Sequence, residues 1–229
     1  MNDLSEKEQI DELRSWWKEN RAWILGGVGI GLAAIIGFRM YQSQQLDDAL
    51  QASARYEALV NEVADDKLDP AIEISNLIFT ENSDTVYASQ ARLAMARLYM
   101  DRGRDADAAD VLRPLAEASG DDPLHLVARL RLARVLLYQD KPQEALDLLK
   151  KPTDTAFSAR FNELIGDAHF ALGNMAEAAA AYEAVLADTA AQQTVNVQFV
   201  RMKLDDLPDA DEPETADVSS ATTTDEATE

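Results

Sequence analysis

The side chains able to do acid–base or metal chemistry are few. The chain has no cysteine and two histidines, His125 and His169. His169 shares a predicted helix with Glu163 and Asp167, but side chains two residues apart on a helix do not face each other, so His169 and Asp167 would pair poorly. Neither histidine stands at the spacing of a metal site or of a nucleophile and its base. We therefore expect a noncatalytic protein with no cofactor and no metal; the rival hypothesis, a soluble enzyme, would depend on His169.

One glycine pattern resembles a phosphate-binding loop. Gly29-x-Gly31-x-x-Ala34 fits the spacing of the dinucleotide-binding fingerprint. That fingerprint needs a strand before it and a helix opening at it, whereas here the apolar run continues through it unbroken. Gly-x-Ser-x-Gly and P-loop patterns are absent from the sequence. The match is coincidental.

The charge balance excludes nucleic acid as a partner. The 229 residues include 21 basic and 42 acidic side chains, a net charge of −21 at pH 7. Phosphates need a basic surface, so we expect no binding of nucleic acid. Apolar residues make up 47% of the chain, which is enough for a folded core, and without disulfides that core is held by packing alone.

An uncharged segment near the N-terminus predicts a single membrane anchor. Residues 22–38 carry no charge and are bounded by Arg21 and Arg39. This length is near the shortest that spans a bilayer, and flanking arginines extend it by reaching toward the headgroups. Aromatic rings, which favour the headgroup layer, stand near both edges: Trp16, Trp17, Trp23 and Tyr41. We expect a transmembrane helix at residues 22–40, held in the lipid bilayer.

Two alternatives to an anchor are weaker. A cleaved signal peptide would have a small-x-small cleavage site just behind the apolar run. The first such triplet is Ala52-Ser53-Ala54, well past Phe38. A core helix of a soluble domain would not need to be bracketed by arginines and aromatic rings. An uncleaved anchor accounts for the flanks best.

Small residues recur at every fourth position within the apolar run. They are Gly27 and Gly31 in one register, and Gly29, Ala33 and Gly37 in another. Such a stripe predicts transmembrane packing, because it lets a second membrane helix approach closely. Membrane helices also tolerate glycine without any partner, so both possibilities stay open.

Basic residues around the span favour a cytoplasmic N-terminus. Four precede it and two follow it: Lys7, Arg14, Lys18 and Arg21, then Arg39 and Arg55. The positive-inside rule then places residues 1–21 in the cytoplasm and the large C-terminal part outside it, in the periplasm of a Gram-negative host. Ser5-x-x-Glu8 is a capping box, which predicts a short amphipathic helix leading into the membrane.

Residues 41–207 are rich in alanine and leucine and contain a repeat. Three segments superpose through a turn residue, a small residue five positions later and a bulky residue four positions after that. The sets are Gly103/Ala108/Leu112, Asp140/Ala145/Leu149 and Gly173/Ala178/Tyr182, with Ala96, Ala133 and Gly166 at a small position upstream. The turns lie 37 and 33 residues apart, close to the 34-residue tetratricopeptide repeat. We predict an all-α fold, in which one transmembrane helix precedes a tetratricopeptide-like superhelix.

Weaker features extend the array at both ends. Residues 46–79 align as a fourth unit through Ala71 but lack the turn glycine. Four apolar residues with helical spacing predict a capping helix: Val197, Val200, Leu204 and Leu207. Residues 208–229 hold eight acidic residues, five threonines and no basic residue, which predicts a disordered acidic tail.

A repeat stack offers a groove lined by its first helices. Under the repeat alignment the candidate protein-binding residues are Arg97, Met100, Arg134, Leu137, Tyr138 and Phe170, with Asp167 beside them. They form an apolar row next to a charged one, which suits an extended or helical polypeptide. For Phe170, packing against a cap is an equal alternative.

Several segments together resemble a known family. "WWKENR" before the span, "GFRMYQSQQ" after it, "LRLARVLL", "GDAHFALGN" and a closing "MKLDDL" are similar to the YfgM-like family of ancillary SecYEG translocon subunits. The resemblance runs from about Glu12 to Leu207 and leaves out the acidic tail. It implies a bacterial inner-membrane protein with a periplasmic tetratricopeptide-like domain. It also implies partners: the SecYEG translocon, a membrane-anchored periplasmic chaperone related to peptidyl-prolyl isomerases, and newly exported polypeptides.

Two functions are compatible with these features. The first is a noncatalytic, chaperone-like accessory subunit of the Sec protein translocon. The second is an envelope-anchored repeat adaptor that organises another cell-envelope complex through the same groove. An adaptor should bind one defined partner and ignore unfolded chains.

Overall fold

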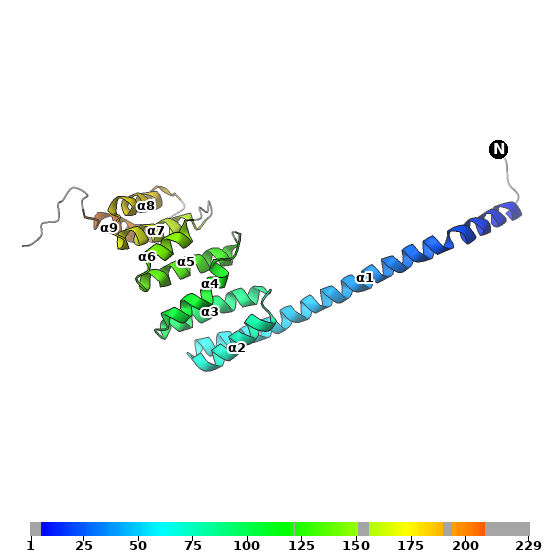
Figure 1. Ribbon diagram of the computed structural model, residues 1–229, viewed down its shortest axis with the longest axis horizontal. Helices are drawn as coiled ribbons and strands as arrows, with labels where there is room; N and C mark the ends of the chain where they lie inside the picture. The colour runs from blue at the N-terminus through cyan, green and yellow to red at the C-terminus, as the bar shows by residue number, and fades with distance from the viewer. Residues whose placement is uncertain (1–5, 121, 151–155, 190–193, 209–229) are drawn as a thin grey trace, which may run out of the picture. The chain divides into compact units, whose positions relative to one another are not determined.

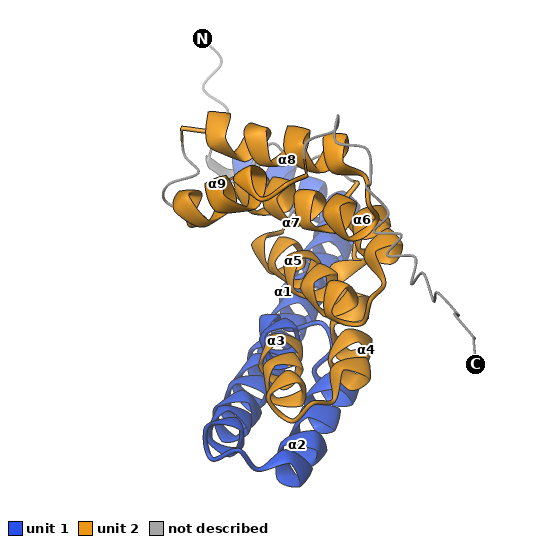
Figure 2. Ribbon diagram, turned by 90° about the vertical axis from the view of Figure 1, so that its left-hand side faces the viewer, with its two compact units in different colours: residues 1–91 blue, residues 92–229 orange. Residues whose placement is uncertain are grey.

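The computed structural model describes residues 6–120, 122–150, 156–189 and 194–208 (Figure 1). Within these ranges every regular element is a helix, which confirms the all-α prediction. The helices are α1 Glu6–Ala64, α2 Leu68–Glu81, α3 Val86–Asp101, α4 Asp105–Ala116, α5 Pro123–Tyr138, α6 Pro142–Leu149, α7 Ser158–Ala171, α8 Met175–Ala187 and α9 Val197–Asp205. They form two compact units, Met1–Ala91 and Arg92–Glu229, and the boundary falls inside α3 (Figure 2).

Helix α1 is a single helix of 59 residues. It contains the predicted cytoplasmic lead, the apolar run and the beginning of the predicted repeat domain, so the expected short separate helix before the span is instead the first part of α1. No proline occurs before Pro70, and glycine weakens a helix by only about 1 kcal/mol relative to alanine, so nothing in this stretch stops the helix. The expected boundaries at residues 21/22 and 40/41 are therefore not marked by any break in the backbone.

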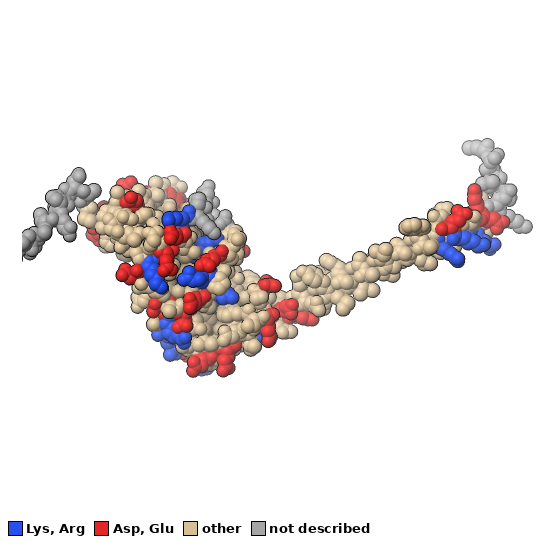
Figure 3. All heavy atoms as spheres, viewed as in Figure 1, with Lys and Arg blue, Asp and Glu red and all other residues tan. Residues whose placement is uncertain are grey.

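The apolar part of α1 has the properties of a membrane span. It is long and apolar enough to cross a bilayer, and none of the most apolar window is buried inside the protein. A core helix of a soluble domain would be mostly buried. Figure 3 shows this part of α1 bare of charged side chains, with acidic and basic groups before it and acidic groups after it. In lipid, a continuous helix satisfies every backbone hydrogen bond internally.

The C-terminal part of α1 and α2 form the weakly predicted fourth repeat. Ala52 and Leu59 on α1 and Ala71 and Ile78 on α2 are fully buried. Arg55 on α1 donates to Asn82 Oδ1 at 2.6 Å and forms an ion pair with Glu81, which holds the end of α2 against α1. This unit is thus a helical hairpin like the others.

The turn residue of each hairpin has a left-handed backbone conformation, which the hairpin of α1 and α2 reaches with an aspartate instead of a glycine. Asp66, Gly103, Asp140 and Gly173 have φ values of 58°, 67°, 57° and 78°. Aspartate is one of the few residues besides glycine that adopts this left-handed conformation readily. Five residues after each turn, Ala71, Ala108, Ala145 and Ala178 are all 0% exposed. The predicted repeat alignment is confirmed in all four hairpins.

Unit Arg92–Glu229 contains two apolar clusters. The larger one joins residues of α3 to α7, including Ala96, Leu112, Ala133 and Leu149. The smaller one joins α7, α8 and α9 around Tyr182, Val185 and Val200. Val197, Leu204 and Leu207 pack around that cluster, so the predicted capping helix is confirmed as α9. Two predictions lie outside the described residues: the Ser5 cap and the acidic tail beyond Pro208.

Candidate protein-binding site

Four of the six predicted groove residues lie together. Arg97 and Met100 on α3 and Arg134 and Tyr138 on α5 line a hollow of about 400 Å³. Met100 and Arg134 come from neighbouring first helices, as the repeat alignment expected. Arg131, which the alignment did not select, also lines this hollow, and Ala96, Leu112 and Val135 complete its apolar wall. We call this surface the arginine hollow.

The other two predicted residues lie elsewhere. Leu137 is half-buried and packs against the larger apolar cluster. Phe170 is half-exposed in a second hollow of about 410 Å³, which is lined by residues of α7, α8 and α9 and by Asp206. The expected apolar row of Met100, Leu137 and Phe170 is therefore divided between a hollow, the edge of the core and a second hollow.

Three guanidinium groups gather at the arginine hollow. The Arg131 side chain donates to the carbonyl oxygen of Leu93 at 3.0 Å, which ties it to α3. Burial, and then the charges of Arg134 and Arg97, lower the pKa of Arg131. Arg97 approaches Asp101 at 3.6 Å in an exposed pair, and such pairs contribute little. The hollow therefore presents positive charge in a strongly acidic protein.

The second hollow is built around Lys203, on the capping helix. Its ammonium lies 2.9 Å from Glu163 Oε1 and 2.8 Å from Asp167 Oδ1, and 4.8 Å from the centre of the Phe199 ring. Tyr182 donates to Asp167 Oδ1 at 2.8 Å. Burial and this hydrogen bond to Asp167 raise the pKa of Tyr182 above its usual value, so its hydroxyl remains a donor to Asp167 even in alkaline solution. The two carboxylates on α7 thus hold α8 and α9 in place.

The structure does not pair His169 with Asp167. Nδ1 of His169 lies 3.4 Å from the side-chain nitrogen of Asn174, while Asp167, its neighbour in sequence, pairs with Lys203 and Tyr182. Within the described ranges no group of three potential ligands could hold a metal ion.

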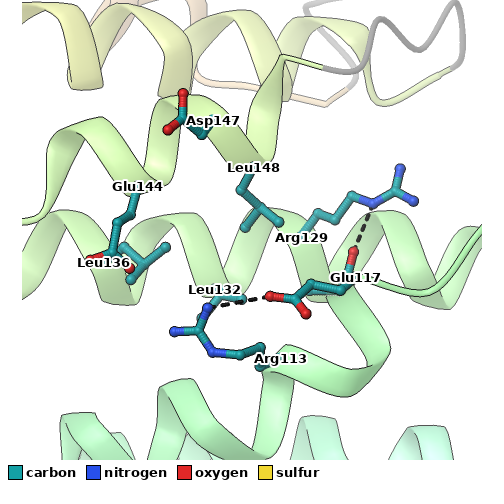
Figure 4. Close-up of a pocket in the computed structure, with 9 residues that line it drawn as sticks. Arg113, Glu117, Arg129, Leu132, Leu136, Glu144, Asp147 and Leu148 are labelled. Atoms are coloured by element: carbon teal, nitrogen blue, oxygen red, sulfur yellow. Dashed lines mark hydrogen bonds and ion pairs between the residues drawn. The ribbon is translucent and has the colours of Figure 1, made fainter.

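A third hollow of about 340 Å³ lies between α4, α5 and α6 (Figure 4). Arg113, Glu117, Glu144 and Asp147 give it charges of both signs. At its side, Arg129 is 3% exposed and donates to three carbonyl oxygens: Ala116 at 2.8 Å, Ala118 at 2.8 Å and Gly120 at 3.2 Å. These are carbonyls that α4 leaves unpaired at and just beyond its C-terminus. Arg129 therefore fixes the turn between α4 and α5.

The small residues predicted for transmembrane packing lie on α1. A Cβ atom built at Gly27, Gly29, Gly31 or Gly37 would meet nothing within 4 Å, and Ala33 is exposed. One described chain thus leaves this stripe uncovered, and packing against another membrane helix stays a prediction.

Sequence reasoning missed Arg131 and Lys203. Arg131 precedes Arg134 by three residues, which places both on one face of a helix, so helical spacing alone could have found it. Lys203 meets Asp167 across 36 residues of chain, and no local pattern predicts that pairing.

Comparison with known proteins shows which family the chain belongs to. A family model described as a tetratricopeptide repeat-like domain matches residues 14–209. A protein of Haemophilus influenzae named "Ancillary SecYEG translocon subunit" is 31% identical over 208 residues, which cover 89% of this chain and 98% of that protein. A protein of Escherichia coli K12 with the same name is 32% identical over 181 residues, or 79% of this chain and 86% of that protein.

A solved structure is similar in fold alone. The tetratricopeptide-like repeats of a Podosopora anserina kinesin light chain superpose with a TM-score of 0.50 at 19% identity, over 67% of this chain and 83% of theirs. This agrees with the helical hairpins and their shared turn conformation. The chain carries a tetratricopeptide repeat-like domain and belongs to the family of ancillary SecYEG translocon subunits.

Proposed function

We propose that this protein is a noncatalytic accessory subunit of the Sec translocon in the bacterial inner membrane. The observation that carries the proposal is the similarity to translocon subunits along nearly their whole length, including the apolar part of α1. In this proposal α1 anchors the protein in the bilayer and brings it to the channel.

The repeat hairpins give the protein its binding surface. We propose that they hold a membrane-anchored periplasmic chaperone, or an exported polypeptide as it leaves the channel. The hollows along α3, α5 and α7 support this, because they place apolar side chains beside charged ones on exposed helices. Surfaces of this kind bind peptide segments by burying a few large side chains.

The continuity of α1 places the first hairpin close to the end of the apolar run. Asn82, at the end of α2, donates to the carbonyl of Asp48 on α1. Asp48 lies ten residues beyond Phe38, about 15 Å along a helix at 1.5 Å per residue. The first hairpin therefore begins within about 15 Å of the end of the apolar run, and no loop separates it from the span.

Co-purification tests the proposed function. Full-length protein, extracted from cells in a mild detergent, should recover translocon subunits. The matched control replaces residues 22–38 with a polyleucine span of equal length, which keeps the anchor and removes the small-residue stripe. Recovery with both chains assigns the contact to the repeat domain or the flanks, whereas recovery with the native chain alone assigns it to the span. If neither chain recovers a translocon subunit and one other envelope protein appears, the protein is an adaptor.

The orientation of the anchor has a direct test, because the chain has no cysteine. The single-cysteine variants Ser15→Cys, before the span, and Ser83→Cys, after it, both replace exposed residues. In intact spheroplasts a membrane-impermeant maleimide should label the Ser83→Cys protein at once and the Ser15→Cys protein only after permeabilisation. Labelling in the reverse order would show a periplasmic N-terminus and contradict the proposed topology.

A further inference from the structure

We infer that the arginine hollow binds an acidic peptide segment of a partner protein, with a large apolar side chain of that segment seated between α3 and α5 and its carboxylates paired with Arg131 and Arg134. This inference deepens the proposed function, since it states the chemistry of the segment that the repeat domain holds.

The first argument is the lack of acidic partners at Arg131 and Arg134. Acidic residues outnumber basic ones two to one in the whole chain. Most arginines and lysines that form ion pairs do so on the surface, for example Arg104 with Asp107 and Arg113 with Glu117. Among the residues that the structure describes, no carboxylate lies within ion-pair distance of Arg131 or Arg134. Both guanidinium groups keep donors for a carboxylate that comes from outside.

The second argument is the position of the guanidinium groups. Arg131 is held by the Leu93 carbonyl and Arg97 lies nearby on α3, so positive charges stand on both helices that form the hollow. The mutual repulsion of these charges is relieved when a carboxylate binds between them. Arginine pairs with carboxylates through two parallel hydrogen bonds, which makes such pairs stronger and more directional than a lysine pair.

The third argument is the apolar wall. Met100 and Val135 line the hollow, and Tyr138 at its edge is 71% exposed. An aromatic ring left this exposed on a helix gains free energy when another apolar side chain covers it. The volume of about 400 Å³ is at the lower end of the range for ligand sites and accepts one or two large side chains rather than a folded domain.

The same features argue against the acidic tail of this chain as the occupant. Residues 209–229 contain eight acidic residues but no aromatic residue, leucine, isoleucine or methionine; Val218 is their largest apolar residue. The tail could neutralise the arginines but would leave the apolar wall uncovered. A partner segment that combines both kinds of side chain fits the whole surface.

A peptide-binding measurement on the full-length chain in detergent micelles tests the inference. The probe is a fluorescent peptide with two glutamates on each side of a phenylalanine. Two matched peptides carry glycine in place of phenylalanine, or lysines in place of the glutamates. Anisotropy should show saturable binding of the first peptide, weaker binding of the second and none of the third. Equal binding of all three would overturn the inference.

Variants of the hollow complete the test. Arg134→Gln should weaken binding of the acidic aromatic peptide about tenfold, as expected for the loss of a charged hydrogen-bonded pair. Arg134 is exposed and makes no described contact that folding needs, so the variant should fold normally. Tyr138→Ser should weaken binding several-fold. The control Arg201→Gln removes an exposed arginine of α9, outside the hollow, and should leave affinity unchanged.

Two further outcomes would overturn the binding of a partner segment, and another would overturn the proposed function alone. If Arg134→Gln binds the peptide as tightly as Arg201→Gln does, the inference fails, while co-purification with the translocon can still succeed and support the proposed function. If the full chain binds no peptide but a chain ending at Pro208 does, the tail fills the hollow, and the proposal of a partner segment is overturned. Loss of co-purification with normal peptide binding would instead remove the proposed function alone.

Discussion

The substitution Gly166→Ala should lower the free energy of unfolding of the repeat domain by about 2 kcal/mol, the middle of the range for overpacked cores. A Cβ atom at Gly166 would lie 2.6 Å from Cδ1 of the Tyr182 ring and closer still to Cε1. The ring cannot move away easily, because Tyr182 is 2% exposed and its hydroxyl is bonded to Asp167. Alanine favours a helix by about 1 kcal/mol over glycine, and this gain offsets part of a larger steric cost.

Urea unfolding of the full chain in micelles, followed by far-ultraviolet circular dichroism, would measure the change. The control Gly37→Ala adds the same methyl group to a helical glycine with nothing within 4 Å, so it has no steric cost and the midpoint should not fall. In a Tyr182→Leu background, Gly166→Ala should lower the free energy of unfolding by less than it does in the native chain, because the ring that crowds the new methyl group is gone. Unchanged stability of Gly166→Ala would contradict the close contact between α7 and α8.

The substitution Arg129→Met should destabilise the repeat domain by about 3 kcal/mol, because each carbonyl left without a donor costs about 1–3 kcal/mol and not all of the three are fully buried. Methionine fills a similar volume but donates no hydrogen bond, so the carbonyls of Ala116, Ala118 and Gly120 lose a shared donor. A buried acceptor without a donor costs more than the hydrogen bond itself contributes.

The matched control is Arg113→Met, in the same part of the chain. Arg113 forms an exposed pair with Glu117, and such pairs contribute at most about 1 kcal/mol. The same unfolding measurement should therefore separate the two arginines clearly. Equal effects would mean that Arg129 does not hold the turn between α4 and α5. Hydrogen exchange at residues 117–120 should also rise in Arg129→Met alone.

The repeat could be predicted from the sequence because its signals are local. A left-handed turn and an alanine five residues later reflect one hairpin geometry, and this geometry recurs at Gly103, Asp140 and Gly173. The rule even extended to Asp66, where aspartate replaces glycine. The capping helix was predictable for the same reason, since the spacing of Val197, Val200 and Leu204 is helical whatever lies beneath it.

The contacts that divide the groove could not be predicted in this way. The alignment placed Met100, Leu137 and Phe170 at one position of the repeat, but burial at that position depends on which side chains the next helix supplies. α9 brings Phe199 and Lys203 beside Phe170, while Leu137 packs on the larger cluster. Similarly, the sequence marked the ends of the apolar run by charge, yet charge does not interrupt a helix, and α1 continues through both ends.

Neither the similarity to known proteins nor the structure identifies the binding partners by itself. Similarity connects the chain to translocon subunits, and the structure contributes a long apolar helix that continues into a helical hairpin, together with hollows on the later hairpins. Helix α1 joins the apolar run to the first hairpin, because it runs through both without a break. A contact made by the span and a contact made by the hairpins should therefore occur on one molecule at the same time.

Photocrosslinking in living cells tests this claim most directly, with a probe at Gly29 in the span or at Tyr138 in the arginine hollow. The adducts would be identified by mass spectrometry, with Asp110, exposed on α4 and outside that hollow, as the control position. We expect translocon subunits crosslinked to Gly29 and a periplasmic chaperone or exported polypeptide crosslinked to Tyr138. A single envelope protein unrelated to export, crosslinked at both Gly29 and Tyr138, would contradict it.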